Sequence, residues 1–126
     1  MSVESPVGRW SRRIAHPRMT LRAEAPVGDV LDALAADLDA AGFRVRDRDA
    51  TGFRARRIPW FDWLSTAAVS SCVLAVRSHV DHVEVYVENV GATPAPRRVA
   101  EAIGSTVVRF RDRGIGVEWT EWEPTH

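Results

Sequence analysis

The sequence of 126 residues contains no lysine, one tyrosine and one cysteine. A single cysteine, Cys72, excludes an intramolecular disulfide, and its apolar neighbours favour a small buried side chain over a nucleophile. No apolar run is long enough to span a bilayer, and residues 1–18 lack the apolar core of a secretory signal. We therefore expect a cytoplasmic protein without a membrane partner.

The charge balance is neutral, because 17 basic residues, all arginine, face 17 acidic residues. A generic binder of nucleic acid or membrane surfaces is normally basic, so only a local patch could serve that function. Arginine suits bidentate recognition of phosphate or carboxylate. A GC-rich genome is the favoured explanation of the preference, since alanine, valine and glycine are also plentiful.

Known catalytic motifs are missing from the sequence. It has no glycine-rich phosphate loop, no Gly-x-Ser-x-Gly motif, and no cysteine with an evident histidine partner. Asp62 with Glu84 or Glu88 could be imagined as an acid–base pair, but nothing fixes their separation. The sequence indicates no cofactor and leans against an enzyme without excluding one.

Hydrophobic periodicity predicts one α+β domain over residues 19–126, preceded by an irregular basic arm of residues 1–18. Two amphipathic helices are expected, each with a single apolar stripe that ends at a glycine. The acidic residues of the first helix lie mostly off its stripe and should face solvent. The expected elements are strand 19–24, helix 27–38, strands 43–48, 53–56, 71–77 and 82–90, helix 99–110 and strand 117–122.

This order, β-α-β-β-β-β-α-β, places the two helices on one face of an antiparallel sheet of about five or six strands. The element order resembles that of ferredoxin-like domains with an inserted hairpin, a resemblance in topology alone. One connection is ambiguous. Residues 78–81 contain no glycine, so they form either a hairpin turn or a bend in one long strand.

The sheet face without helices is expected to carry charges of both signs. Arg44, Arg46, Arg54 and Arg56 alternate with apolar residues in the hairpin 43–57 and should face away from the core. This hairpin has a local charge of +4, and residues 114–126 have a local charge of −3. The two blocks could neutralise each other within the fold or between subunits.

Two further clusters stand out. Trp60, Phe61 and Trp63 lie within four positions and could line an apolar pocket, anchor a protein partner or simply cover the sheet. His79 and His82 form the one histidine pair, but their spacing is not the helical i, i+4 that favours a metal site. A polar turn is the simpler interpretation, and we predict no metal.

Three functions remain open. The first is a non-enzymatic interaction or accessory domain, which self-associates or binds a protein through the open sheet face and the Trp60–Trp63 segment. The second is a nucleic-acid-binding domain that uses the arginine-rich hairpin, and the third is a ligand-binding or enzymatic pocket between helices and sheet. The candidate partner-binding residues are Trp60, Phe61, Trp63, Arg44, Arg46, Arg54, Arg56, Tyr86 and Trp122.

Overall fold

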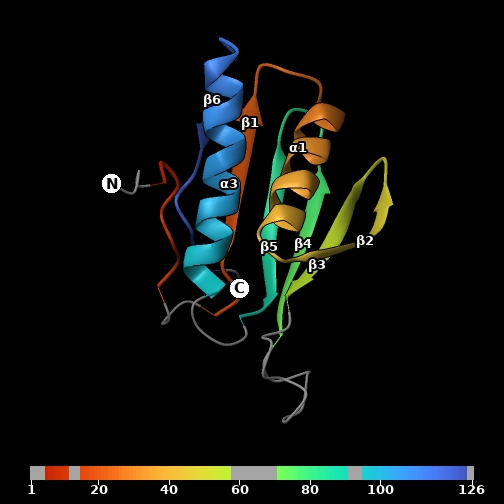
Figure 1. Ribbon diagram of the computed structural model, residues 1–126, viewed down its shortest axis with the longest axis vertical. Helices are drawn as coiled ribbons and strands as arrows, with labels where there is room; N and C mark the ends of the chain where they lie inside the picture. The colour runs from red at the N-terminus through yellow and green to blue at the C-terminus, as the bar shows by residue number, and fades with distance from the viewer. Residues whose placement is uncertain (1–4, 12–14, 58–70, 91–94, 125–126) are drawn as a thin grey trace.

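The computed structural model describes residues 5–11, 15–57, 71–90 and 95–124. It shows two helices packed against one face of a six-stranded antiparallel sheet, which confirms the predicted α+β class (Figure 1). The elements are β1 (Arg18–Ala23), α1 (Val27–Ala40), β2 (Arg44–Asp49), β3 (Gly52–Arg57), β4 (Cys72–Ser78), β5 (Val83–Asn89), α3 (Ala95–Asp112) and β6 (Val117–Trp119).

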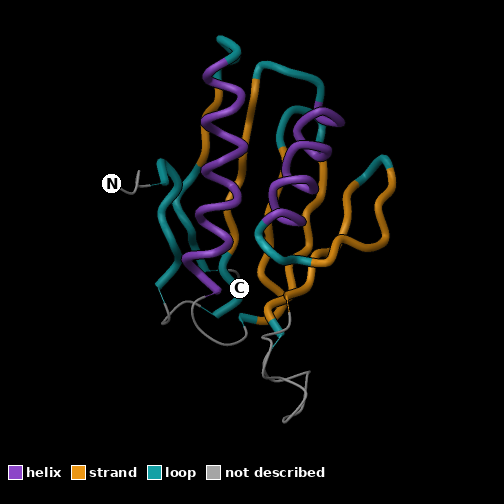
Figure 2. Tube along the Cα trace, in the orientation of Figure 1, coloured by secondary structure: helices purple, strands orange, loops and turns teal. Residues whose placement is uncertain are grey.

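The strands lie side by side in the order β2-β3-β4-β5-β1-β6. Strand β1 therefore lies between β5 and β6, and the β2–β3 hairpin extends the opposite edge (Figure 2). Without that hairpin, the remaining order along the chain is the β-α-β-β-α-β of ferredoxin-like domains. The likeness is an analogy, because the hairpin adds two strands to the sheet.

The core lies between the helices and the sheet because β1, β3 and β5 alternate apolar and polar residues, while β4 is apolar from Cys72 to Val76. Met19 and Leu21 of β1 are fully buried, as are the stripe residues Leu34 of α1 and Ile103 of α3. The segment 79–82 is a hairpin turn closed by a 2.8 Å bond from the His79 N–H to the His82 carbonyl. It joins two separate strands, β4 and β5.

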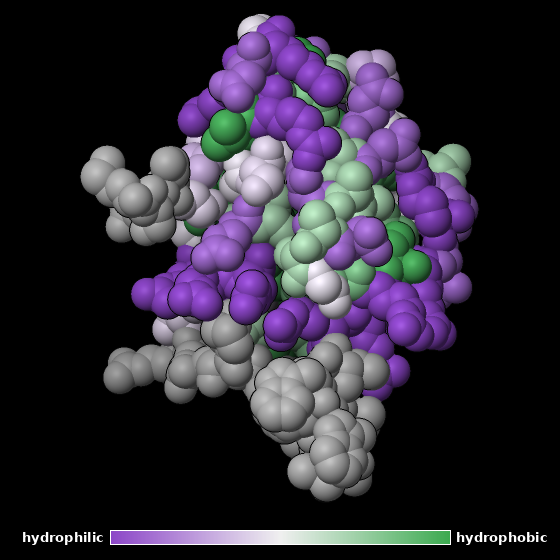
Figure 3. Space-filling view, viewed as in Figure 1, coloured by the Kyte–Doolittle hydropathy of each residue, from purple (hydrophilic) through white to green (hydrophobic). Residues whose placement is uncertain are grey.

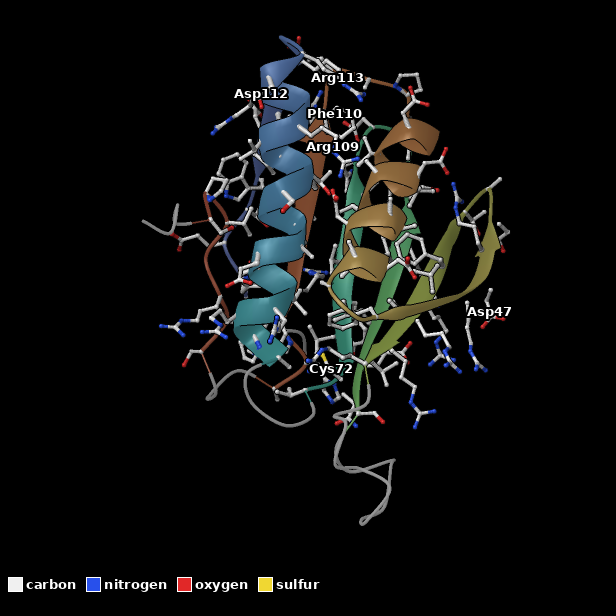
Figure 4. The ribbon with its side chains drawn as sticks, in the orientation of Figure 1. Asp47, Cys72, Arg109, Phe110, Asp112 and Arg113 are labelled. Atoms are coloured by element: carbon white, nitrogen blue, oxygen red, sulfur yellow. The ribbon has the colours of Figure 1, made fainter. Side chains whose placement is uncertain are left out.

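One acidic residue of α1 departs from the prediction that the acids face solvent. Asp37 is buried at the contact between the two helices, where its carboxylate accepts hydrogen bonds from the Thr106 hydroxyl and the Arg109 guanidinium. Arg109 extends from α3 toward α1 in Figure 4. A buried carboxylate needs such partners to offset its desolvation, and α3 supplies both of them. Helical periodicity within α1 could not indicate this.

The N-terminal residues 5–11 pack along α3 and β6. Val7 and Trp10 are buried in the core, and the Ser5 hydroxyl donates to the Ala100 carbonyl over 2.8 Å. Gly104 allows this approach, because a side chain there would collide with the Ser5 hydroxyl. The described part of the arm is thus joined to the domain by apolar packing.

The β2–β3 hairpin depends on a glycine at its junction with β4. Gly52 has a φ of 152° and pairs with Arg77, so an added Cβ would overlap the Val76 carbonyl oxygen. The collision involves backbone of a central strand, which cannot move aside cheaply. Gly52 therefore fixes how closely the hairpin can pack against the rest of the sheet.

Gly52→Ala is expected to lower the free energy of unfolding by about 2 kcal/mol or more, because backbone must shift in both strands. Gly28→Ala is the matched control. It lies in α1 with open space around it, and alanine should stabilise the helix there by about 0.5–1 kcal/mol. Urea unfolding followed by far-UV circular dichroism measures both. Equal effects of the two substitutions would contradict the close-contact argument.

Candidate functional site: an arginine pocket on the open sheet face

The face of the sheet that carries no helix presents charge in columns, each of one sign. Arginines stand on the three neighbouring strands β2, β3 and β4, glutamates on β5, arginines again on β1, and a glutamate on β6. The side chains on this face are Arg44 and Arg46, Arg54 and Arg56, Val73, Ala75 and Arg77, Glu84, Tyr86 and Glu88, Arg18, Thr20 and Arg22, and Glu118. The expected mixture of signs is present, and its pattern follows the strand order.

A cavity of about 500 Å³ opens at the outer end of this face. Four arginines from two strands and one aspartate line it, together with a glycine and a half-buried valine. Figure 3, drawn from the helix side, shows hydrophilic side chains along the flank formed by β2 and β3. We call this site the arginine pocket; its lining residues are Gly42, Arg44, Arg46, Asp47, Arg54, Arg56 and Val73.

The strand register places like charges directly opposite each other in the arginine pocket. Arg44 pairs with Arg56, and Arg46 pairs with Arg54. Side chains in such pairs lie about 5 Å apart at Cβ, and like charges there destabilise the sheet. The hairpin therefore has to hold four guanidinium groups together against their repulsion.

Only part of this charge is compensated within the described chain. Arg54 forms an ion pair with Glu88, and Arg56 donates two hydrogen bonds, of 3.1 and 3.0 Å, to the buried Ser71 hydroxyl. Arg44 and Arg46 are exposed, and no ion pair joins either to a described residue. The outer half of the arginine pocket thus has the chemistry of an anion-binding site.

Several local interactions hold the hairpin in place. The Asp49 carboxylate accepts bonds from the Thr51 hydroxyl (2.6 Å) and the Thr51 N–H (2.7 Å), which lower the pKa of Asp49. Asp47 has a φ of 57° at a bulge, and it lies at the outer flank of the hairpin in Figure 4. Beyond the bulge Arg48 reaches α1 and bonds Asp32 over 2.6 Å. These contacts fix the strand that carries Arg44 and Arg46.

The other predicted binding residues do not join the arginine pocket. Tyr86 lies on β5 of the same face, stacked 5.8 Å from the His16 ring. Trp122 lies beyond β6 at the far edge, in edge contact with Trp10, and donates its ring N–H to the Gly8 carbonyl. The predicted segment of Trp60, Phe61 and Trp63 lies outside the described residues.

Three lining residues of the pocket were not among the predicted site residues. Asp47 had a weak signal, a carboxylate set between arginines in an otherwise alternating strand. Gly42 was expected only as a helix stop, and Val73 only as a strand residue. Val73 lines the site because β4 pairs with β3, a long-range contact that no local pattern encodes.

The histidine pair forms a small polar cluster at the β4–β5 turn. The rings of His79 and His82 stack with centroids 4.6 Å apart, and His82 Nδ1 lies 2.8 Å from the Asp81 carboxylate. This bond lowers the pKa of Asp81. Within the described ranges, no group of three or more potential ligand side chains is arranged to hold a metal ion.

Cys72 lies at the start of β4 with 2% of its surface exposed (Figure 4). Burial raises the pKa of its thiol to about 12, and the positive charge of Arg57 lowers it only in part. The reactive thiolate is therefore scarce at neutral pH. The structure gives Cys72 the surroundings of a packing residue.

Comparison with known proteins adds no family: no family model matches the chain, and no curated protein matches it significantly. Of the helices in the described ranges, none is both long and apolar enough to cross a membrane. The fold and the charge arrangement of the open face are therefore the observations on which a functional proposal rests.

Because the strand register places like charges opposite each other, we predict that an arginine of the pocket lowers the free energy of unfolding. Arg44→Gln should raise the free energy of unfolding by about 0.3–0.5 kcal/mol, because it relieves repulsion with Arg56. Arg22→Gln is the matched control on the same face. Arg22 lies opposite Glu118 and 3.7 Å from the Asp81 carboxylate, so its loss should destabilise slightly. Effects of the same sign in urea unfolding at low salt would contradict this account.

Because the Cys72 thiol is buried, we predict that the free energy of unfolding depends on pH in the alkaline range. The folded pKa of Cys72 is about 12 and the ordinary value is 9.0, so the unfolded chain loses its proton first as pH rises. This makes stability fall above pH 9. Relative to Cys72→Ala, the wild type should lose about 1 kcal/mol of its free energy of unfolding between pH 7 and pH 10. Parallel stability profiles of the two proteins would show that the thiol is accessible when folded.

Proposed function

We propose that this chain is a non-enzymatic binding domain that docks an acidic region of a protein partner on the arginine pocket of its open sheet face. The observation that carries the proposal is the pair of guanidinium groups of Arg44 and Arg46, which form no ion pair with a described residue and are held opposite two further arginines. An anionic partner would remove the repulsion that the fold alone leaves in place. Arginine also binds carboxylates in a bidentate geometry with directional hydrogen bonds.

The surrounding charge supports a protein partner over nucleic acid. Glu84 and Glu88 stand on β5, separated from the arginine pocket by the single strand β4. A phosphate backbone that continued across the face would meet these carboxylates, one of which already pairs with Arg54. Columns of both signs suit a partner surface with charges of both signs, which gives specificity.

We expect the partner to bind at the outer edge of the open face and not across the whole of it. The middle of the sheet is neutralised internally, since Arg18 lies 3.7 Å from Glu84 and Arg54 pairs with Glu88. Ion pairs at exposed positions hold little free energy and can exchange partners, but they offer no net charge to a ligand. The outer edge formed by β2 and β3 therefore provides most of the attraction.

The direct test is fluorescence anisotropy with a labelled ten-residue oligoglutamate at low salt. We expect binding by the wild type and at least about a tenfold weaker affinity for the double variant Arg44→Gln with Arg46→Gln, since each charge-assisted contact contributes about 1 kcal/mol or more. Arg9→Gln with Arg113→Gln removes the same charge from exposed positions outside the pocket and should bind like wild type.

Two results would contradict the proposal. Equal loss of affinity in both double variants would mean that net charge rather than the arginine pocket attracts the probe. A labelled oligothymidine that binds more tightly than oligoglutamate, with a steep dependence on salt, would instead favour single-stranded nucleic acid. Circular dichroism of each variant shows that lost binding does not reflect unfolding.

A further inference from the structure

The arginine pocket lies beside an edge of the sheet. Strand β2 is the outermost strand, and within the described residues it pairs only with β3. The backbone donors and acceptors of an edge strand can pair with an added chain. Pocket and edge therefore adjoin, so one extended segment could use both.

The regular part of this edge is short and has a defined end. Register between β2 and β3 is continuous over Arg44, Val45 and Arg46, then shifts between Arg46 and Asp49. Asp47, with its positive φ, interrupts the extended backbone there. Such a bulge limits unspecific edge pairing. An added segment would pair along about three residues and then leave the edge.

Strand geometry sets the pattern that such a segment must have. Arg44 and Arg46 face the same side of the sheet, and alternate residues of a strand lie about 6.8 Å apart. On an added strand, side chains i and i+2 would stand beside these arginines at about 5 Å. Side chain i+1 would lie on the other side, next to the half-buried Val45. The matching pattern is acidic, apolar, acidic.

On this basis we propose that the β2 edge and the arginine pocket together bind an extended acidic–apolar–acidic segment of a protein partner by strand addition. This inference rests on the proposed function and specifies the partner's form. The carboxylates at positions i and i+2 of the added segment pair with Arg44 and Arg46. Arg54 and Arg56 on β3 add to the positive potential at this site. The apolar residue at position i+1 covers Val45.

A second copy of this chain is a weaker occupant. Its Glu121-Trp122-Glu123 has the required pattern, but the structure already engages this segment. Glu123 and Arg18 exchange two 2.9 Å backbone hydrogen bonds, and Trp122 packs on Trp10. Docking in a second copy would require these contacts to break. A segment from another protein carries no such cost.

The test compares two labelled nine-residue peptides of identical composition, one with alternating Glu-Val-Glu-Val-Glu at its centre and one with Glu-Glu-Glu-Val-Val. We expect the alternating peptide to bind at least about tenfold more tightly. A version with N-methyl groups on alternate backbone nitrogens, placed on the edge-facing side, should lose that advantage. Amide hydrogen exchange should slow in residues 44–46 when the alternating peptide binds.

The control variants separate this inference from the proposed function. Arg46→Gln should abolish the preference for the alternating peptide, whereas Arg113→Gln should leave it unchanged. Equal affinity for both peptides, or binding without protection of residues 44–46, overturns strand addition and leaves the acidic-partner function standing. Binding of neither peptide, with no binding of oligoglutamate, overturns both.

Light scattering shows whether the β2 edge binds a segment of another protein or a second copy of this chain. A monomer at micromolar concentration is the expected result. A concentration-dependent assembly that disappears in Glu121→Gln with Glu123→Gln would overturn the external partner in favour of a second copy. Near-UV circular dichroism of that variant must match wild type, because Trp122 and Trp10 report on the local packing.

Discussion

The structure depends on one constraint: two helices with a single apolar stripe each must bury both stripes on the same sheet. Because α1 and α3 cover one face, the apolar residues of β1, β3 and β5 point to that face, and the alternation of these strands sends their polar residues to the other. The open face is therefore a direct consequence of the core. It collects most of the charge that the strands carry.

What this face can do is decided by the strand order. Neighbouring columns of opposite sign neutralise each other in the middle of the sheet, as between Arg18 and Glu84. At the outer edge two arginine columns adjoin, because β2 and β3 come from one hairpin with the same alternation. Repulsion at this edge is tolerated since Gly52, the Asp49 turn and the contact of Arg48 with Asp32 hold the hairpin. Natural proteins often retain such local strain where it supports binding.

The helix pair is held together by more than apolar contact. Asp37 of α1 accepts hydrogen bonds from Thr106 and Arg109 of α3, so a buried charge joins the two stripes at one defined position. If the helices shifted relative to each other, the buried carboxylate would lose the hydrogen bonds that offset its desolvation. This requirement favours a single register between the helices. This polar contact also fixes the position of α1, which in turn anchors the hairpin through Asp32.

Local sequence patterns were enough to predict the element order, both helix stripes and the alternation that turns four arginines away from the core: Arg44, Arg46, Arg54 and Arg56. These features follow from local periodicity, which the chain carries within a few residues. It could not show which strands are neighbours, that residues 79–82 form a turn, or that Asp37 finds partners on α3.

The arginine pocket illustrates the difference. Its four arginines were predicted from their own strands, but Val73 and the ion pair of Arg54 with Glu88 arise from pairing between segments more than 15 residues apart. That two arginine columns lie at an edge, and that glutamates lie beyond β4, follows from the strand order of the folded sheet. Strand pairing brings together residues that are far apart in the chain, and local periodicity carries no information about which strands pair.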